Sequence, residues 1–139
     1  MTWSIVARDE SGALGVAIAS RFFAVGALCP YARSRVGALA TQALVNPGYG
    51  PAGLDRVAHG CLPQQVIEAL VAEDDGREHR QVHVVDADGR AAAYTGRQCI
   101  GWCGRLAAAG ITDRAIIERE VERFRASGTA GASEPASDA

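Results

Sequence analysis

The stretch TWSIVARDESGALGVAIAS, residues 2–20, decides the fold of this chain. Residues 3–8 and 14–20 are rich in small and β-branched side chains, whereas Asp9-Glu10-Ser11-Gly12 between them is a turn signal. Two such runs joined by a short polar turn are typical of antiparallel strands. We therefore predict that the chain begins with a β-hairpin.

The next part of the chain predicts a mixture of strands and helices. Asn46-Pro47-Gly48-Tyr49-Gly50-Pro51 is a loop signal, and the segments around it have strand or helix periodicity. The predicted elements are a strand over 36–43, helices over 52–59 and 62–73, and a second strand pair over 81–85 and 90–95. This order indicates an α+β protein rather than a nucleotide-binding parallel sheet, which would need βαβ units.

The last third of the chain has a different composition. The segment 114–126, preceded by the N-cap residues Thr112 and Asp113, predicts one amphipathic helix. Its apolar stripe consists of Ile117, Val121 and Phe124. Residues 127–139 contain no large apolar side chain and predict a disordered tail. We therefore expect a main domain over 1–104, a divergent segment over 105–126 and a tail over 127–139.

Length and composition exclude several function classes. A chain of 139 residues, of which 48% are hydrophobic, is large enough for one domain with its own core. The net charge of −2 provides no broad basic surface, so we expect neither nucleic-acid nor membrane binding. All 14 cationic residues are arginine, which excludes mechanisms that need a lysine amine.

The sequence predicts a cytoplasmic protein without metal or cofactor. The pair Arg8-Asp9 lies where a signal peptide would be apolar, and every apolar run is shorter than the roughly 20 residues that span a bilayer. Because the cytosol is reducing, we expect the four cysteines to be free thiols. Cys99 and Cys103 are four residues apart and form no paired ligand set of the kind that structural zinc sites use.

Several multi-residue motifs occur in the order found in one known family. They are Thr2-Trp3-Ser4-Ile5-Val6-Ala7, residues 15–26 with Pro30, Ala40-Thr41-Gln42-Ala43, Asn46-Pro47 with Tyr49-Gly50, Arg80-Gln81, Val84-Val85-Asp86 with Gly89, and Thr95-Gly96 with Cys99. Over residues 2–104 the chain resembles the family called domain of unknown function 1028. The resemblance implies the N-terminal-nucleophile (Ntn) hydrolase-like fold, an αββα sandwich, which a divergent C-terminal third would leave incomplete.

Thr2 is the candidate catalytic residue. Methionine aminopeptidase removes Met1 when the second residue is small, and Thr2 would then carry a free α-amine. The Thr2 hydroxyl would attack a carbonyl, and the amine, with an unperturbed pKa of about 7.7–8.0, would accept its proton. The alternative is that Thr2 is simply the first residue of a strand.

Ser20 and Arg21 are candidate substrate-binding residues. They end the second strand of the predicted hairpin, which brings them near the N-terminus. The Arg21 guanidinium would bind a substrate carboxylate through two parallel hydrogen bonds or lower the pKa of the α-amine. The alternative for Arg21 is a surface ion pair. Proteasome-like Ntn hydrolases carry an Asp at the place of Ala19 and a lysine near the nucleophile, and this chain has neither.

Thr41, Gln42, Asn46 and Tyr49 complete the candidate substrate-binding set. The first three lie at and just after the end of an apolar strand, where hydroxyls and amides orient a substrate or stabilise an oxyanion. Their alternative is loop capping through Asn46-Pro47. Tyr49, between glycines, either lines a pocket or covers the core.

The sequence therefore predicts an Ntn-type hydrolase that acts on an amide or related acyl bond of a small molecule. Two alternatives stay open: a non-catalytic member that binds a small molecule or a partner through the same cleft, and a shortened copy with weak or no activity. A sandwich that is short of strands exposes an edge or an apolar face. The helix over 114–126 or a second chain in a homodimer would cover it.

Overall fold

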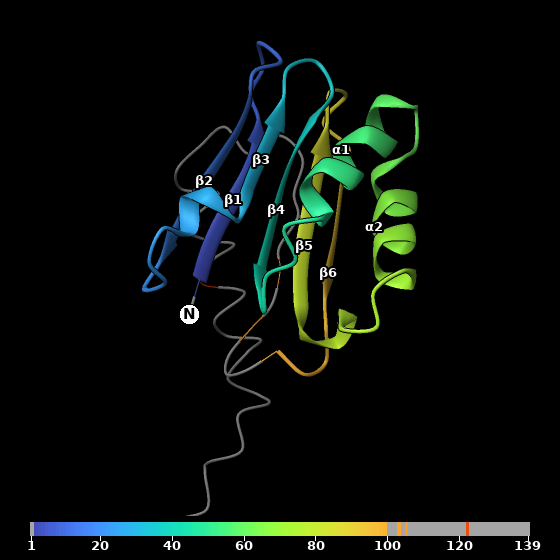
Figure 1. Ribbon diagram of the computed structural model, residues 1–139. Coiled ribbons are helices and arrows are strands. Elements are labelled where there is room, and N and C mark those ends of the chain that lie inside the picture. Colours follow the sequence, from blue (N-terminus) through green and yellow to red (C-terminus); the bar gives the residue numbers. More distant parts are fainter. Residues whose placement is uncertain (1, 100–102, 104, 106–121, 123–139) are drawn as a thin grey trace, which may run out of the picture. The chain divides into compact units, whose positions relative to one another are not determined.

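The computed structural model describes residues 2–99, 103, 105 and 122. The chain divides into two compact units, Met1–Ala107 and Ala108–Ala139. All the strands and helices below lie in the first unit (Figure 1). The predicted helix over 114–126 and the predicted tail over 127–139 lie outside the described residues, apart from Glu122.

The N-terminal hairpin is present as predicted. Strand β1 (Thr2–Arg8) pairs antiparallel with β2 (Leu14–Ser20), and the register joins Thr2 to Ser20 at one end and Arg8 to Leu14 at the other. Gly12 lies in the turn with φ 87°, a left-handed conformation that glycine adopts without steric cost. The register therefore brings the first described residue of the chain beside the last residue of β2.

A second, four-stranded antiparallel sheet follows in the order β3-β4-β5-β6. Its strands are β3 (Pro30–Arg33), β4 (Gly37–Ala43), β5 (Arg80–Asp86) and β6 (Ala91–Thr95). Three of them agree with the predicted strands to within one residue. Strand β3 was not predicted, because it is only four residues long and begins with a proline, as edge strands often do.

Two helices connect β4 to β5. Helix α1 (Tyr49–Ala58) begins three residues before the predicted start at residue 52, because its first turn includes the glycine- and proline-rich loop signal. Pro51 is tolerated there, since the first N–H groups of a helix have no intrahelical acceptor. Helix α2 (Pro63–Ala72) begins with a proline, and the Gln65 side chain accepts a hydrogen bond from the Leu62 N–H at 2.9 Å.

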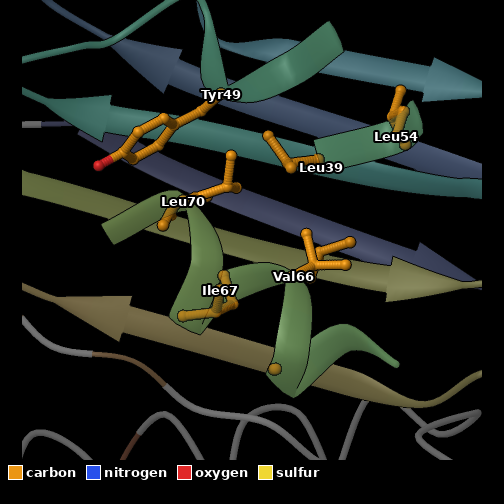
Figure 2. Packing of buried hydrophobic residues seen from close by; sticks show 9 residues of the cluster. Leu39, Tyr49, Leu54, Val66, Ile67 and Leu70 are labelled. Carbon is orange, nitrogen blue, oxygen red and sulfur yellow. The ribbon is translucent and has the colours of Figure 1, made fainter. Parts of the chain in front are cut away.

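The hydrophobic core lies between these helices and one face of the four-stranded sheet (Figure 2). Leu39, Val82 and Val84 from the sheet are fully buried against residues of both helices. The helical side of the core consists of Tyr49, Leu54, Val66, Ile67 and Leu70. Helix α1 can lie close to β4 because Gly53 has no side chain. A Cβ atom at this position would lie only 2.6 Å from Leu39 Cδ1.

The hairpin packs on the opposite face of the four-stranded sheet. Strand β1 contacts β4 and β5, and its side chains alternate between inward and outward positions. Thr2, Ser4 and Val6 point inward, whereas Trp3 and Ile5 on the outer face are 48% and 62% exposed. The described residues thus form a helical layer, a four-stranded layer and a hairpin layer.

This arrangement confirms the α+β fold class with antiparallel sheets. An αββα sandwich has a second helical layer, and that layer is not among the described residues. The outer face of the hairpin carries the exposed apolar side chains of Trp3 and Ile5. The expectation that an incomplete sandwich exposes an apolar face stays a prediction, because the C-terminal third lies outside the described residues.

Candidate functional site

The candidate site lies at the open end of the hairpin, where β1 begins and β2 ends. Thr2 and Ser20 are register partners, and their hydroxyl oxygens Oγ1 and Oγ lie 3.0 Å apart. Both side chains are half-buried. The Phe22 N–H donates to Ser20 Oγ at 3.0 Å, so the chain that follows β2 orients the Ser20 hydroxyl. The hairpin therefore gives Thr2 a hydroxyl neighbour held in place by the backbone.

Gln42 joins this end of the hairpin to the four-stranded sheet. The Ser4 hydroxyl donates to Gln42 Oε1 at 2.6 Å, and Gln42 Nε2 donates to the carbonyl oxygen of Thr2 over a longer 3.4 Å. The same amide nitrogen donates to Gln81 Oε1 at 2.6 Å, and Gln81 Nε2 donates to Thr95 Oγ1 at 3.0 Å. Gln42, Gln81 and Thr95 are cross-strand neighbours on β4, β5 and β6.

His83 lies on the same face of β5 as Gln81, two residues further along the strand. Its Nε2 atom is 3.2 Å from Ser4 Oγ. Burial between hairpin and sheet lowers the pKa of His83 to about 4, because desolvation disfavours the charged imidazolium. His83 is therefore a neutral imidazole near pH 7.

Two residues that directly follow site residues, Ala43 and Arg21, have unusual features. Ala43, directly after Gln42, has φ 70°, a left-handed conformation that a non-glycine residue seldom adopts and that often occurs at functional sites. Arg21, directly after Ser20, is exposed and makes no hydrogen bond or ion pair with the described residues. Its guanidinium is thus available to solvent next to the candidate site.

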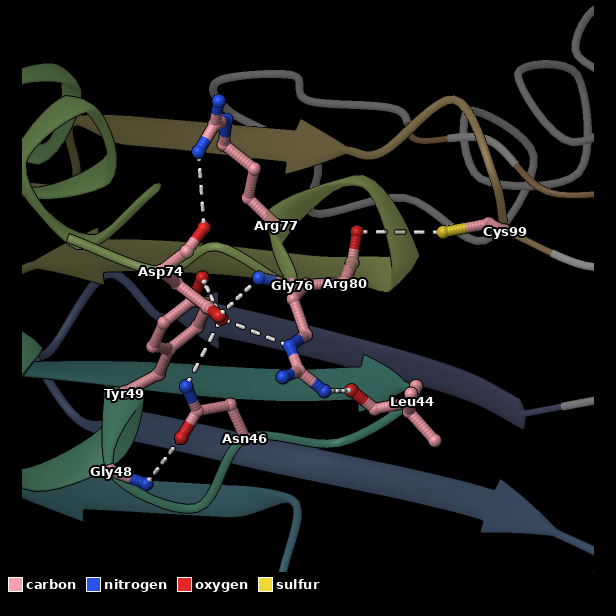
Figure 3. Close-up of polar contacts among 9 residues, drawn as sticks. All are labelled: Leu44, Asn46, Gly48, Tyr49, Asp74, Gly76, Arg77, Arg80 and Cys99. Carbon is pink, nitrogen blue, oxygen red and sulfur yellow. Dashed lines mark hydrogen bonds and ion pairs between the residues drawn. The ribbon is translucent and has the colours of Figure 1, made fainter. Parts of the chain in front are cut away.

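Asn46 and Tyr49 belong to a separate hydrogen-bond network centred on Asp74 (Figure 3). Asp74 Oδ2 accepts from Asn46 Nδ2 at 3.1 Å, from the Tyr49 hydroxyl at 2.8 Å and from Arg80 Nε at 2.9 Å. Arg80 also donates to the carbonyl of Leu44 at 2.6 Å. This network joins the loop before α1 to the segment between α2 and β5, on the helical side of the sheet.

The pKa shifts of Asp74 and Tyr49 indicate that this network has a structural role, as an anchor. The hydrogen bond from Arg80 is the main reason why the pKa of Asp74 lies well below its usual range. Burial, together with the bond to Asp74, raises the pKa of Tyr49 well above its usual value. Asn46 Oδ1 also accepts from the Gly48 N–H at 3.1 Å, which is the loop-capping role considered as the alternative for this residue.

Thr41 lies on the opposite face of β4 from Gln42. Successive side chains of a strand alternate between the two faces, so Thr41 shares the helical side with Leu39. It is fully buried, and its Oγ1 has no hydrogen-bond partner within the described part of the chain. Thr41 and Gln42 therefore do not contribute to one site, although they are adjacent in sequence.

The structure thus brings together only some of the predicted site residues. Thr2, Ser20 and Gln42 lie within one hydrogen-bonded region, with Arg21 adjoining it in the chain. Thr41, Asn46 and Tyr49 face the helical layer. Sequence reasoning missed Ser4, Gln81, His83 and Thr95. The period-two alternation of β1, β5 and β6 places these polar residues at inward positions, a signal that could have identified them.

The described residues give no indication of a metal site or a membrane span. No group of three metal-ligating side chains occurs among them. The four cysteines are free thiols in the structure. None of the helices in the described part of the chain has the length and apolar character needed to cross a membrane.

The fold and the site define a class of protein: an antiparallel α+β domain whose N-terminal hairpin carries paired hydroxyls at its open end. The chain belongs to the family of unknown function DUF1028, whose model matches residues 2–132. The match confirms the family resemblance. It also continues to residue 132, so residues 105–132, which we expected to diverge from the family, match the family model as well.

A solved structure from the same family has a similar fold. The chain is similar to protein SPO2555 from Silicibacter pomeroyi, a DUF1028 crystal structure, with 28% sequence identity and a TM-score of 0.77. The similarity covers 90% of this chain and 62% of that one, so the chain spans less than two thirds of the length of its relative. No curated protein matches the sequence.

Proposed function

We propose that this chain is a cytoplasmic hydrolase of the Ntn type, which acts on an amide or related acyl bond of a small molecule with Thr2 as nucleophile. The observation that carries the proposal is the 3.0 Å contact between the hydroxyls of Thr2 and Ser20 at the start of β1. The half-buried Thr2 hydroxyl has a neighbour that orients it. In this proposal the complete fold is an αββα sandwich.

The proposed reaction needs no group beyond the chain and water. Once Met1 is removed, Thr2 Oγ1 adds to the substrate carbonyl carbon, and the α-amine of Thr2 takes the hydroxyl proton. The tetrahedral intermediate then breaks its C–N bond, and the leaving amine receives that proton. Water, deprotonated by the same α-amine, adds to the resulting ester, releases a carboxylic acid and restores the Thr2 hydroxyl.

Arg21 is the proposed recognition residue for an acidic substrate. Its guanidinium is exposed beside Ser20 and is unpaired among the described residues. A planar guanidinium offers two parallel hydrogen bonds to a carboxylate. The substrate class that fits is therefore an acyl compound that carries a carboxylate.

One observation favours a second candidate, a non-catalytic protein that binds a small molecule at the same place. The side chains hydrogen-bonded around Thr2 and Ser4 are all neutral: Ser20, Gln42 and His83. Without the α-amine this neutral set contains no strong base, because the pKa of His83 is lowered to about 4. Retention of Met1 would therefore give a binding protein.

A hydroxyl-reactive acylating probe tests the proposed hydrolase. We expect covalent labelling of the wild type, loss of labelling in Thr2→Ala, and nearly unchanged labelling in the control variants Cys99→Ser and Cys103→Ser. Equal loss in the cysteine variants would indicate thiol chemistry instead. Labelling of Thr2→Ala at the wild-type rate would remove Thr2 as the nucleophile.

A further inference from the structure

The direction of the hydrogen bonds around Gln42 follows from one backbone carbonyl. A carbonyl oxygen only accepts, so the Gln42 atom that contacts Thr2 O must be the amide nitrogen. That nitrogen also donates to Gln81 Oε1, which leaves Gln42 Oε1 directed at the Ser4 hydroxyl. Gln42 therefore contacts β1 at two points, the carbonyl of Thr2 and the hydroxyl of Ser4.

The hydrogen bonds of Ser4 determine which ring nitrogen of His83 carries the proton. Ser4 has a single hydroxyl proton, and it is donated to Gln42 Oε1 at 2.6 Å. Ser4 Oγ can then only accept from His83 Nε2, which lies 3.2 Å away. His83 must therefore carry its proton on Nε2.

Gln42 has no N–H donor left for a substrate. Its two N–H groups point to Thr2 O and Gln81 Oε1, and its oxygen accepts from Ser4. It is also buried, with only 7% of its surface exposed, as is Gln81. The buried amide is thus part of the protein scaffold that contacts the start of β1.

We propose that Gln42 is a positioning residue for Thr2: through Thr2 O and Ser4 Oγ it holds the first residues of β1 on the sheet and so sets the place of the Thr2 hydroxyl beside Ser20. The inference rests on the proposed function, in which Thr2 is the nucleophile. Gln81 and Thr95 orient the Gln42 amide from the neighbouring strands.

Nuclear magnetic resonance of the imidazole nitrogens tests the hydrogen-bond directions without any activity. In the wild type we expect neutral His83 with its proton on Nε2. In Gln42→Leu the Ser4 proton is released and can be donated to His83 Nε2, so the imidazole proton should move to Nδ1. In Gln42→Glu the introduced carboxylate still accepts from Ser4, so the proton should stay on Nε2.

Probe kinetics test the positioning role itself. Gln42→Glu keeps the size of the side chain but loses both N–H donors, including the one to Thr2 O. We expect the rate of Thr2 acylation to fall about tenfold or more, since misplacement by about 1 Å can cost up to roughly 10²-fold, while the reversible affinity for the probe stays unchanged. The deficit relative to wild type should shrink at low pH, where the introduced carboxyl regains a proton to donate.

The same substitution at an exposed position, Gln98→Glu, is the matched control and should label at the wild-type rate. A folded Gln42→Glu variant with the wild-type rate, or a wild-type His83 protonated on Nδ1, would overturn the inference. If the wild type is not labelled at all, the proposed function fails, and amide exchange of Trp3 and Ser4 decides the positioning role. Exchange about tenfold faster in Gln42→Glu would support that role, and unchanged exchange would overturn it.

Discussion

The hydroxyl of Thr2 lies 3.0 Å from the hydroxyl of Ser20, its register partner at the open end of the hairpin. Ser20 Oγ also accepts a backbone hydrogen bond from Phe22, which orients the hydroxyl that contacts Thr2. This contact links the start of the chain to a residue 18 positions later. It is the geometric basis of the proposed chemistry.

Removing the Ser20 hydroxyl should slow acylation at Thr2. A hydrogen bond of this kind contributes about 1 kcal/mol, so we expect Ser20→Ala to reduce the labelling rate roughly five- to tenfold. The control is Ser11→Ala in the exposed hairpin turn, where the hydroxyl donates to Asp9 Oδ1 at 2.7 Å. Equal labelling rates in both variants would show that Ser20 does not assist Thr2.

Thr41→Val should stabilise the protein or leave its stability unchanged. The buried Thr41 hydroxyl has no partner among the described residues, and valine replaces it with a methyl group of similar shape. We expect the free energy of unfolding, measured in urea, to rise by up to about 1 kcal/mol, with unchanged labelling at Thr2. A decrease of that size would show that the hydroxyl is hydrogen-bonded in solution.

Asp74→Asn should destabilise the protein by about 2–3 kcal/mol, because Arg80, Tyr49 and Asn46 all donate to the Asp74 carboxylate. The folded-state pKa of Asp74 is lowered, so its contribution is present above about pH 5 and is lost as the pH falls through the unfolded and then the folded pKa. The free energy of unfolding of the wild type, of Asp74→Asn and of the exposed control Asp75→Asn, measured above and below pH 5, checks the size of the loss and its pH dependence. Equal stability of the two variants would contradict the anchor role.

The stability of the wild type should fall between pH 6.5 and pH 4 because of His83. Its pKa is about 4 in the folded state and near 6.5 when unfolded, so the unfolded chain binds the proton first as the pH falls. The loss amounts to as much as roughly 3 kcal/mol. In His83→Gln the free energy of unfolding should change less between pH 6.5 and pH 4 than in the wild type. The control is His59→Gln, at an exposed helix end, which should behave like the wild type.

The elements with strong periodicity could be predicted from the sequence, and the short ones could not. The hairpin and the strands over 37–43 and 80–86 have runs of β-branched or apolar residues bounded by turn signals. Strand β3 has four residues and no such run. The start of α1 was misplaced because glycine and proline also occur in the first turn of a helix.

The candidate site was predictable only in part. Thr2 and Ser20 follow from the hairpin register, which the turn determines. The period-two alternation of β4 already implies that Thr41 and Gln42 point to opposite faces, although the prediction grouped them. The role of Tyr49 depends on Asp74, which lies 25 residues away in the sequence, and no local pattern indicates that contact.

The role of Thr2 as nucleophile is tested most directly by the mass of the mature N-terminal peptide after treatment with the acylating probe. We expect Met1 to be absent and the probe's acyl group to be bound to the Thr2 hydroxyl. An N-terminal peptide that retains Met1, or a probe adduct on another residue with Thr2 unmodified, would show that Thr2 is not the nucleophile.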